Sequence, residues 1–125
     1  MTTITLSGKT FTETVNRDGI VLVDFWAAWC PPCRAFAPLF GAAADQHPDI
    51  VFGKVDTEAE PALSRSLGIM SIPTLMAFRD SILVFSQPGA LPAPTLAKLI
   101  AAVRELDMDD VRSQVAAAEA TAQTA

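Results

Sequence analysis

Residues 20–33, which read IVLVDFWAAWCPPC, decide how this sequence is interpreted. The first seven, Ile20–Trp26, are almost all β-branched, aliphatic or aromatic, which is typical of a strand that is buried on both faces of a sheet. Cys30 and Cys33 follow four and seven residues later, with two prolines between them, and the chain has no other cysteine. A predicted buried strand is therefore followed closely by a pair of thiols.

The spacing of the two cysteines narrows their role. A disulfide across so short a loop removes little conformational entropy from the unfolded chain, so it is a poor structural staple. A structural zinc site needs four ligands, whereas His47 is the only histidine that the chain adds to the cysteine pair. We therefore expect no metal site, and redox chemistry is the favoured interpretation.

Strand-like and helix-like segments alternate along the chain. Apolar spacing and chain breakers predict strand Thr3–Leu6, helix Lys9–Arg17, strand Ile20–Trp26, helix Pro31–Gln46, strand Ile50–Asp56, helix Ala59–Leu67, strands Thr74–Arg79 and Ile82–Phe85 in a hairpin, and helix Pro92–Leu106. This order implies an α/β fold with a mixed central sheet of about five strands, flanked by helices on both faces. Residues 107–125 form an Ala-rich C-terminal extension, for which a short helix and a disordered end are both open.

Charge and hydropathy exclude several classes of protein. A formal net charge of -5 argues against nucleic-acid binding and against anionic membrane surfaces. No uninterrupted apolar run approaches the ~20 residues of a membrane-spanning helix. The N-terminal residues 1–8 show no basic segment leading into an apolar one, so we expect no secretion signal and a cytoplasmic location.

Three motifs together resemble the thioredoxin family: Trp29-Cys30-Pro31-Pro32-Cys33 between a strand and a helix, Asp24 in that strand, and Ile72-Pro73-Thr74 at the start of a later strand. The resemblance runs from about Thr3 to Leu106, and we expect a thioredoxin domain at residues 1–106. It implies a monomeric protein thiol–disulfide oxidoreductase that reduces disulfides in protein substrates. It also implies that no cofactor is bound, because the cysteine pair is the redox group, and that an NADPH-dependent thioredoxin reductase restores the dithiol.

The resemblance and local chemistry assign different roles to the two cysteines. Cys30 occupies the expected N-cap of a helix, where the partial positive charge of the helix terminus lowers the pKa of a thiol. The N–H group of Cys33 is placed to donate to the Cys30 sulfur. We expect Cys30 to be the exposed, attacking nucleophile, and Cys33 to be the less exposed, resolving sulfur.

The two prolines shape this motif. Pro32 matches the commonest thioredoxin sequence, whereas Pro31 replaces the usual glycine. Proline suits the first helical position, but it removes an N–H group that glycine would direct near the thiolate. Because a shift of ~30 mV needs only about 1.4 kcal/mol, we expect a net reductant of milder potential. A more oxidising disulfide oxidase or isomerase remains an alternative.

Asp24 is the charged residue of an otherwise apolar strand. Burial among such neighbours raises the pKa of a carboxyl, which marks a functional candidate. The resemblance implies that Asp24 accepts the proton of Cys33 as the mixed disulfide resolves, and that Lys54 on the next strand modulates Asp24. A purely structural pair between Asp24 and a buried lysine is the alternative.

The resemblance further predicts a substrate-binding surface. The family has a cis peptide bond before the proline that corresponds to Pro73, and this leaves backbone groups of Ile72 free to pair with an extended substrate segment. The expected docking surface around the dithiol consists of Trp29, Ile72, Pro73, Gly89 and Ala90.

A different class of function also stays open. In this alternative, the chain is a non-catalytic binding module with the thioredoxin fold. Either the cysteine pair shares an iron–sulfur cluster across a dimer, or the fold serves as a subunit of a larger complex.

Overall fold

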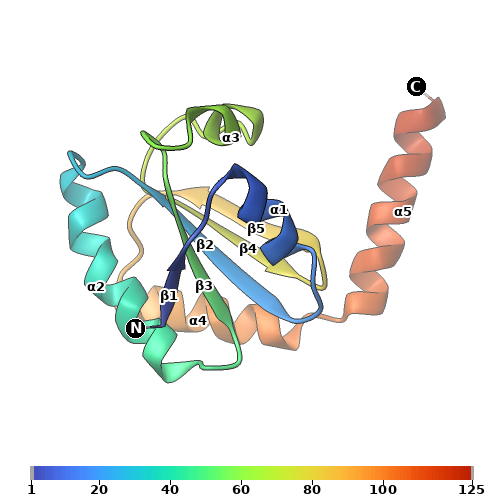
Figure 1. Ribbon diagram of the computed structural model, residues 1–125. Coiled ribbons are helices and arrows are strands. Elements are labelled where there is room, and N and C mark those ends of the chain that lie inside the picture. The colour runs from blue at the N-terminus through green and yellow to red at the C-terminus, as the bar shows by residue number, and fades with distance from the viewer. Residues whose placement is uncertain (1, 125) are drawn as a thin grey trace.

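The computed structural model describes residues 2–124, so Met1 and Ala125, the outermost residues of the predicted domain and extension, lie outside the described residues. Within them, five strands and five helices follow one another (Figure 1). Their bounds are β1 Thr3–Thr5, α1 Gly8–Val15, β2 Ile20–Trp26, α2 Pro31–Gln46, β3 Val51–Asp56, α3 Pro61–Ser66, β4 Thr74–Arg79, β5 Ile82–Pro88, α4 Ala93–Glu105 and α5 Met108–Thr124. Each segment predicted between residues 3 and 106 is present, and its ends lie within three residues of the predicted ones.

The strands form the predicted mixed sheet, in the order β1-β3-β2-β4-β5. Strands β1 and β2 pair in parallel with β3, whereas β4 runs antiparallel to β2 and β5. Strand β2 lies in the middle and is buried along its length up to Trp26, as its continuous apolar sequence predicts. The register places Asp24 of β2 beside Lys54 of β3 and Leu75 of β4.

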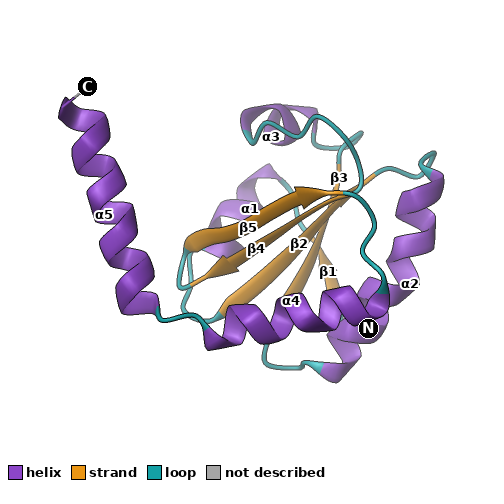
Figure 2. Cartoon of the chain, turned by 180° about the vertical axis from the view of Figure 1, so that it is seen from behind, coloured by secondary structure: helices purple, strands orange, loops and turns teal. Residues whose placement is uncertain are grey.

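Helices cover both faces of the sheet (Figure 2). On one face, Phe36 and Phe40 of α2 and Ile100 of α4 pack with Leu22 and Phe52 of the sheet. The rings of Phe40 and Phe52 meet edge to face, with centroids 5.1 Å apart. On the other face, α1 and α3 pack over a second apolar cluster that contains Phe11, Phe25 and Phe78. The central strand β2 is therefore packed between helices on both faces of the sheet, and this packing fixes the start of the loop that follows it.

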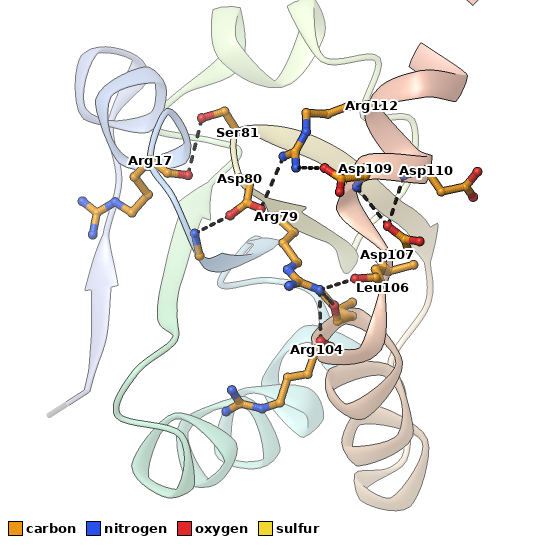
Figure 3. Close-up of polar contacts among 12 residues, drawn as sticks. Arg17, Arg79, Asp80, Ser81, Arg104, Leu106, Asp107, Asp109, Asp110 and Arg112 are labelled. Atoms are coloured by element: carbon orange, nitrogen blue, oxygen red, sulfur yellow. Dashed lines mark hydrogen bonds and ion pairs between the residues drawn. The ribbon is translucent and has the colours of Figure 1, made fainter. Parts of the chain in front are cut away.

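The end of the sheet that lies away from the cysteines is held by polar contacts (Figure 3). Nη1 of Arg79, at the end of β4, lies 2.8, 3.0 and 2.9 Å from the carbonyl oxygens of Val103, Arg104 and Leu106. These are carbonyls at the C-terminus of α4, where a cation is favoured by the helix dipole and by unsatisfied acceptors. Arg79 therefore attaches α4 to the sheet.

The hairpin between β4 and β5 belongs to the same end. Its two linking residues, Asp80 and Ser81, have φ values of 51° and 72°, as a tight two-residue hairpin turn requires. Asp80 accepts a hydrogen bond from the Gly19 N–H at 2.8 Å through its side chain and donates its own N–H to the Gly19 carbonyl at 2.9 Å. The turn is therefore fastened to the segment that leads into β2.

Residues 108–124, for which the sequence left a helix and a disordered end open, form helix α5. Oδ1 of Asp107 accepts hydrogen bonds from the N–H groups of Asp109 and Asp110, which caps the first turn. Met108 is buried against the body, whereas the side chains of residues 116–123 are exposed. Both ribbon views show α5 leading away from the sheet (Figures 1 and 2).

Candidate active site

The two cysteines are joined in a disulfide at the N-terminus of α2. Cys30 is the N-cap residue with an extended backbone (φ -91°, ψ 110°), and Pro31 occupies the first turn as its fixed φ favours. The Cys33 N–H donates to Sγ of Cys30 at 3.3 Å, which is the capping contact predicted from the sequence. The first sulfur of the pair therefore lies directly on the positive end of a sixteen-residue helix.

The prediction that Cys30 is more exposed than Cys33 is wrong for this disulfide form, because each residue is 2% exposed. Sγ of Cys30 lies 3.8 Å from the carbonyl oxygen of Ile72, a residue 42 positions away. Trp26 and Ile72 pack against the small cluster that the cysteines form with Ala27. The sulfurs are thus covered by a loop whose position depends on the tertiary fold, and sequence spacing along α2 does not reveal that cover.

The covering loop contains a cis peptide bond between Ile72 and Pro73, as the resemblance predicted. Pro73 itself is buried, so its ring contributes no open docking surface. The Pro73 carbonyl accepts a hydrogen bond from the Gly89 N–H at 2.7 Å, which links this loop to the end of β5. Gly89 has a φ of +108°, a conformation that residues with a side chain rarely adopt. Ala90 follows it and is exposed.

An apolar hollow of about 420 Å³ lies beside the disulfide. Trp29 forms one wall and is 64% exposed, while Ile72 and Ile69 contribute from the covering loop. Met70, which was not among the predicted site residues, also lines the hollow and is 94% exposed. Its exposure is a tertiary property that the sequence does not reveal, and only its position three residues before Pro73 places Met70 near the predicted docking loop.

Asp24 lies in β2, two residues before the strand ends and six residues before Cys30. Its side chain is fully buried, and neither carboxylate oxygen has a hydrogen-bond partner within residues 2–124. Burial raises the pKa of Asp24 to about 7, and the positive charge of Lys54 opposes this rise. A buried carboxyl with such a pKa is suited to exchanging a proton near neutral pH.

Lys54 neighbours Asp24 across the parallel pair of β2 and β3. Its Nζ lies 4.9 Å from the centroid of the Trp26 ring. No ion pair within 4.0 Å joins Lys54 to Asp24 among the described residues, so the structural salt bridge considered from the sequence is not formed.

Two further findings concern the described part of the chain. Residues 2–124 contain no group of three or more His, Cys, Asp or Glu side chains arranged to hold a metal ion. None of the helices in the same range is long and apolar enough to cross a membrane.

A redox-active disulfide at the N-terminus of a helix, held in a mixed five-stranded α/β fold, defines a class of protein, the thiol–disulfide oxidoreductases. The family model named Thioredoxin matches residues 2–102. The chain therefore belongs to the thioredoxin family, has the thioredoxin fold, and is a thiol–disulfide oxidoreductase.

Known relatives agree with this assignment. Putative thioredoxin 2 of Streptomyces coelicolor is 52% identical over 120 residues, which cover 96% of this chain and 90% of that protein. Thioredoxin 1 of Synechococcus elongatus is 46% identical over 97 residues, 76% of this chain and 91% of its own. The solved thioredoxin of Plasmodium falciparum superposes with a TM-score of 0.71 at 30% identity, over 78% of this chain and 95% of that one. The Streptomyces protein matches all but five residues of this chain, so the matched region extends into α5.

Proposed function

We propose that this protein reduces disulfide bonds in other proteins and that Cys30 is the attacking nucleophile. The observation that carries the proposal is the Cys30 sulfur at the N-cap of α2, where it accepts the Cys33 N–H. In the reduced protein, the same N–H and the helix dipole stabilise a Cys30 thiolate. That thiolate attacks one sulfur of a substrate disulfide, forms a mixed disulfide and releases the other substrate sulfur as a thiolate.

Cys33 completes the exchange in the second step. Its thiol gives a proton to a base, and the resulting thiolate attacks Sγ of Cys30. The mixed disulfide breaks, the second substrate thiolate leaves, and the Cys30–Cys33 disulfide forms. The substrate has then gained two electrons, and the protein has lost two. The structure has the same Cys30–Cys33 disulfide that this sequence of steps would form.

Asp24 is the proposed base for this second step, with Lys54 modulating it. The support is a fully buried carboxyl with unpartnered oxygens, whose pKa of about 7 lies close to neutrality. At pH 7 the carboxyl is divided between its two protonation states, so it accepts a proton without a large thermodynamic penalty. Proton transfer from Cys33 runs through a water in this proposal.

Substrates dock on the apolar surface around the disulfide in this proposal. Trp29 offers exposed apolar area, the half-buried Ile72 lines the same hollow, and the backbone of the covering loop offers hydrogen bonds to an extended substrate segment. Pro73 holds that loop in shape, while Gly89 and Ala90 leave the far side unobstructed. Pro31 and Pro32 hold the first turn of α2.

The oxidised protein needs an electron donor, which we assign to a thioredoxin reductase that uses NADPH, with the chain acting as a monomer. A dithiol that donates electrons must be kept reduced, as the cytoplasm allows, so we propose a cytoplasmic location. We also propose that residues 1–106 constitute the thioredoxin domain and that residues 107–125 are an extension of it.

A coupled turnover assay tests the proposal. NADPH, a thioredoxin reductase and insulin as the disulfide substrate are mixed with the wild type or with Cys30→Ser. Wild-type protein is expected to drive NADPH oxidation and insulin precipitation, and the variant is expected to drive neither. A parallel assay, with dithiothreitol in place of NADPH and the reductase, separates disulfide reduction by this protein from its regeneration by the reductase. If the wild type is active in the dithiothreitol assay but not in the coupled assay, only the reductase assignment is overturned. If it is inactive in both assays, the proposed function is overturned.

A further inference from the structure

Trp26 is the residue of the active-site end to which the proposed chemistry gives no role. It ends β2 and is half-buried, and one side of it packs against the cluster of Ala27, Cys30 and Cys33. Its indole N–H is buried and has no hydrogen-bond partner within residues 2–124. The contacts that the structure gives the Trp26 side chain are therefore made by its ring.

The ammonium of Lys54 lies over the Trp26 ring. Nζ is 4.9 Å from the ring centroid, within the range of a cation–π interaction, and tryptophan binds cations best among the aromatic side chains. Lys54 forms no ion pair within 4.0 Å in the described chain. The Trp26 ring is therefore the contact that the described chain offers to this charge.

The sheet register places this contact next to Asp24. Lys54 is the Cα partner of Asp24, and side chains two apart on a strand share a face, so Asp24 and Trp26 point to the same side of β2. The lysine stem starts beside the carboxylate and ends on the ring. We propose that Trp26 is a positioning residue, whose ring holds the Lys54 ammonium beside the Asp24 carboxylate without letting the two form a direct ion pair.

This arrangement meets two opposing needs, and it rests on the proposed role of Asp24 as a base. A direct ion pair would occupy the carboxylate oxygens that must receive a proton. A lysine extended into solvent would leave burial unopposed, and Asp24 would stay protonated at neutral pH. With the ammonium on the ring, the oxygens stay free, and the charge still opposes the rise that burial causes, which leaves the pKa of Asp24 at about 7.

The remaining groups around Asp24 do not replace Lys54. From β3, Asp56 points to the same face, but its Oδ1 accepts hydrogen bonds from the N–H groups of Glu58 and Ala59 in the following turn. From β4, the register partner of Asp24 is Leu75, which is uncharged. From α2, Cys33 is held in the disulfide in this form.

The test is a titration of the Asp24 carboxyl by ¹³C NMR in the oxidised protein, which needs no turnover. Wild type is compared with Lys54→Met, Trp26→Leu and the double variant. Lys54→Met is expected to raise the midpoint by about one pH unit, because a nearby cation is removed. Trp26→Leu is expected to raise the Asp24 midpoint by about half as much when Lys54 is present. In the Lys54→Met background it is expected to add no further shift.

A merely structural role gives a different sign. If Leu at position 26 only loosens the packing, water reaches Asp24 and its midpoint falls in both backgrounds, which overturns the inference. An unmoved midpoint in Trp26→Leu does the same. Trp26→Phe covers the case in which the leucine variant does not fold: it keeps a ring of weaker cation affinity, and a smaller upward shift that vanishes in Lys54→Met supports the inference. No upward shift in a folded Trp26→Phe overturns it.

A second readout keeps this inference separate from the proposed function. The pH profile of insulin reduction with dithiothreitol is expected to move with the NMR midpoint across the variants. If the NMR midpoints shift as expected and the activity profiles do not move, Trp26 still positions Lys54, and the assignment of Asp24 as the base is the part that fails.

Discussion

The polar side chains at the two ends of the central sheet differ in whether they have hydrogen-bond partners. At the end that carries the disulfide, Asp24 and the Trp26 indole are buried without hydrogen-bond partners in the described chain. At the other end, Arg79 contacts three carbonyls, and Arg104 forms a two-point ion pair with Asp49, with hydrogen bonds of 2.7 and 3.0 Å. Two aspartates summarise the contrast: the pKa of Asp24 is about 7 because of burial, whereas the Arg104 hydrogen bond lowers that of Asp49 to about 2.

This contrast separates groups that react from groups that hold the fold. A buried carboxyl without hydrogen-bond partners lowers the stability of the fold. Such groups are found mainly at functional sites, where they exchange protons. At the far end, the contacts of Arg79 contribute stability, the solvent-exposed pair of Arg104 and Asp49 contributes little, and neither takes part in the proposed chemistry. Substitutions at the disulfide end are therefore expected to lower activity and either to leave stability nearly unchanged or to raise it. Substitution of Arg79 at the far end is expected to lower stability and to leave activity unchanged.

The largest effect is expected from Cys30→Ser. A serine hydroxyl is not ionised near neutral pH, so insulin reduction with dithiothreitol should fall by about a thousandfold or more. The free energy of unfolding, measured by urea titration under reducing conditions for both proteins, should change little because serine also caps helices well. Residual activity within tenfold of wild type would remove Cys30 from the mechanism.

The next effect is expected from Asp24→Asn, and it depends on pH. The folded-state pKa of Asp24 is raised from 3.8 to about 7, so ionisation of this carboxyl opposes folding as the pH rises through that interval. Above pH 7 the full penalty is present, roughly 4 kcal/mol. Asn removes that penalty, so urea titrations should show the variant more stable by up to this amount at pH 8 and no more stable at pH 3.5.

The same variant should be slower in turnover, by about tenfold or more, since a water must replace the base. Equal stability of wild type and Asp24→Asn at pH 8 would show that other interactions compensate the burial of the ionised carboxyl. Full activity of the variant would end the role of Asp24 as a base.

Sequence reasoning reached the parts of the fold that local patterns control. The nearly continuous apolar run of β2 predicted a buried strand, and Cys30 followed by Pro31 predicted the N-cap at Cys30. The resemblance placed Ile72 beside the cysteines, but the burial of Cys30 was missed, because the extent of that cover depends on tertiary packing between residues 42 positions apart. The capping of α4 by Arg79 and the ring contact of Lys54 escaped prediction for the same reason.

The extension was only half determined by its sequence. Alanines favour a helix, and Asp107 is a good N-cap, yet α5 has few large apolar side chains with which to dock. Met70 was missed because exposure, which makes it a candidate for docking, is a tertiary property.

At the far end, Arg79→Met sharpens the comparison. It removes the donor for the carbonyls of Val103, Arg104 and Leu106, so the free energy of unfolding should fall by about 2 kcal/mol while activity at 25 °C stays unchanged. Arg112→Met is the matched control, because Arg112 is half-exposed and pairs with the exposed Asp109 at 2.9 Å and with Asp80 at 3.8 Å. It should change stability by less than about 0.5 kcal/mol. An equal loss in the two variants would remove the special role of Arg79.

The smallest effect is expected from Asp49→Asn. The pKa of Asp49 is lowered to about 2, so any stabilisation from its pair with Arg104 is present above pH 4 and is lost as the pH falls toward 2. Because the pair lies in solvent, the melting temperatures of wild type and variant at pH 7 should agree closely, and more closely still in 1 M NaCl. A large salt-independent difference would contradict the distinction between exposed and buried aspartates drawn here.

The most direct measurement concerns the sulfur at the N-cap of α2. The reduced protein is treated with iodoacetamide between pH 5 and 10, and the labelled cysteine is located by mass spectrometry. We expect the label on Cys30, with a rate midpoint well below the ~8.5 of a free thiol. A midpoint at the free-thiol value, or labelling mainly on Cys33, would contradict the proposal that the helix terminus activates Cys30.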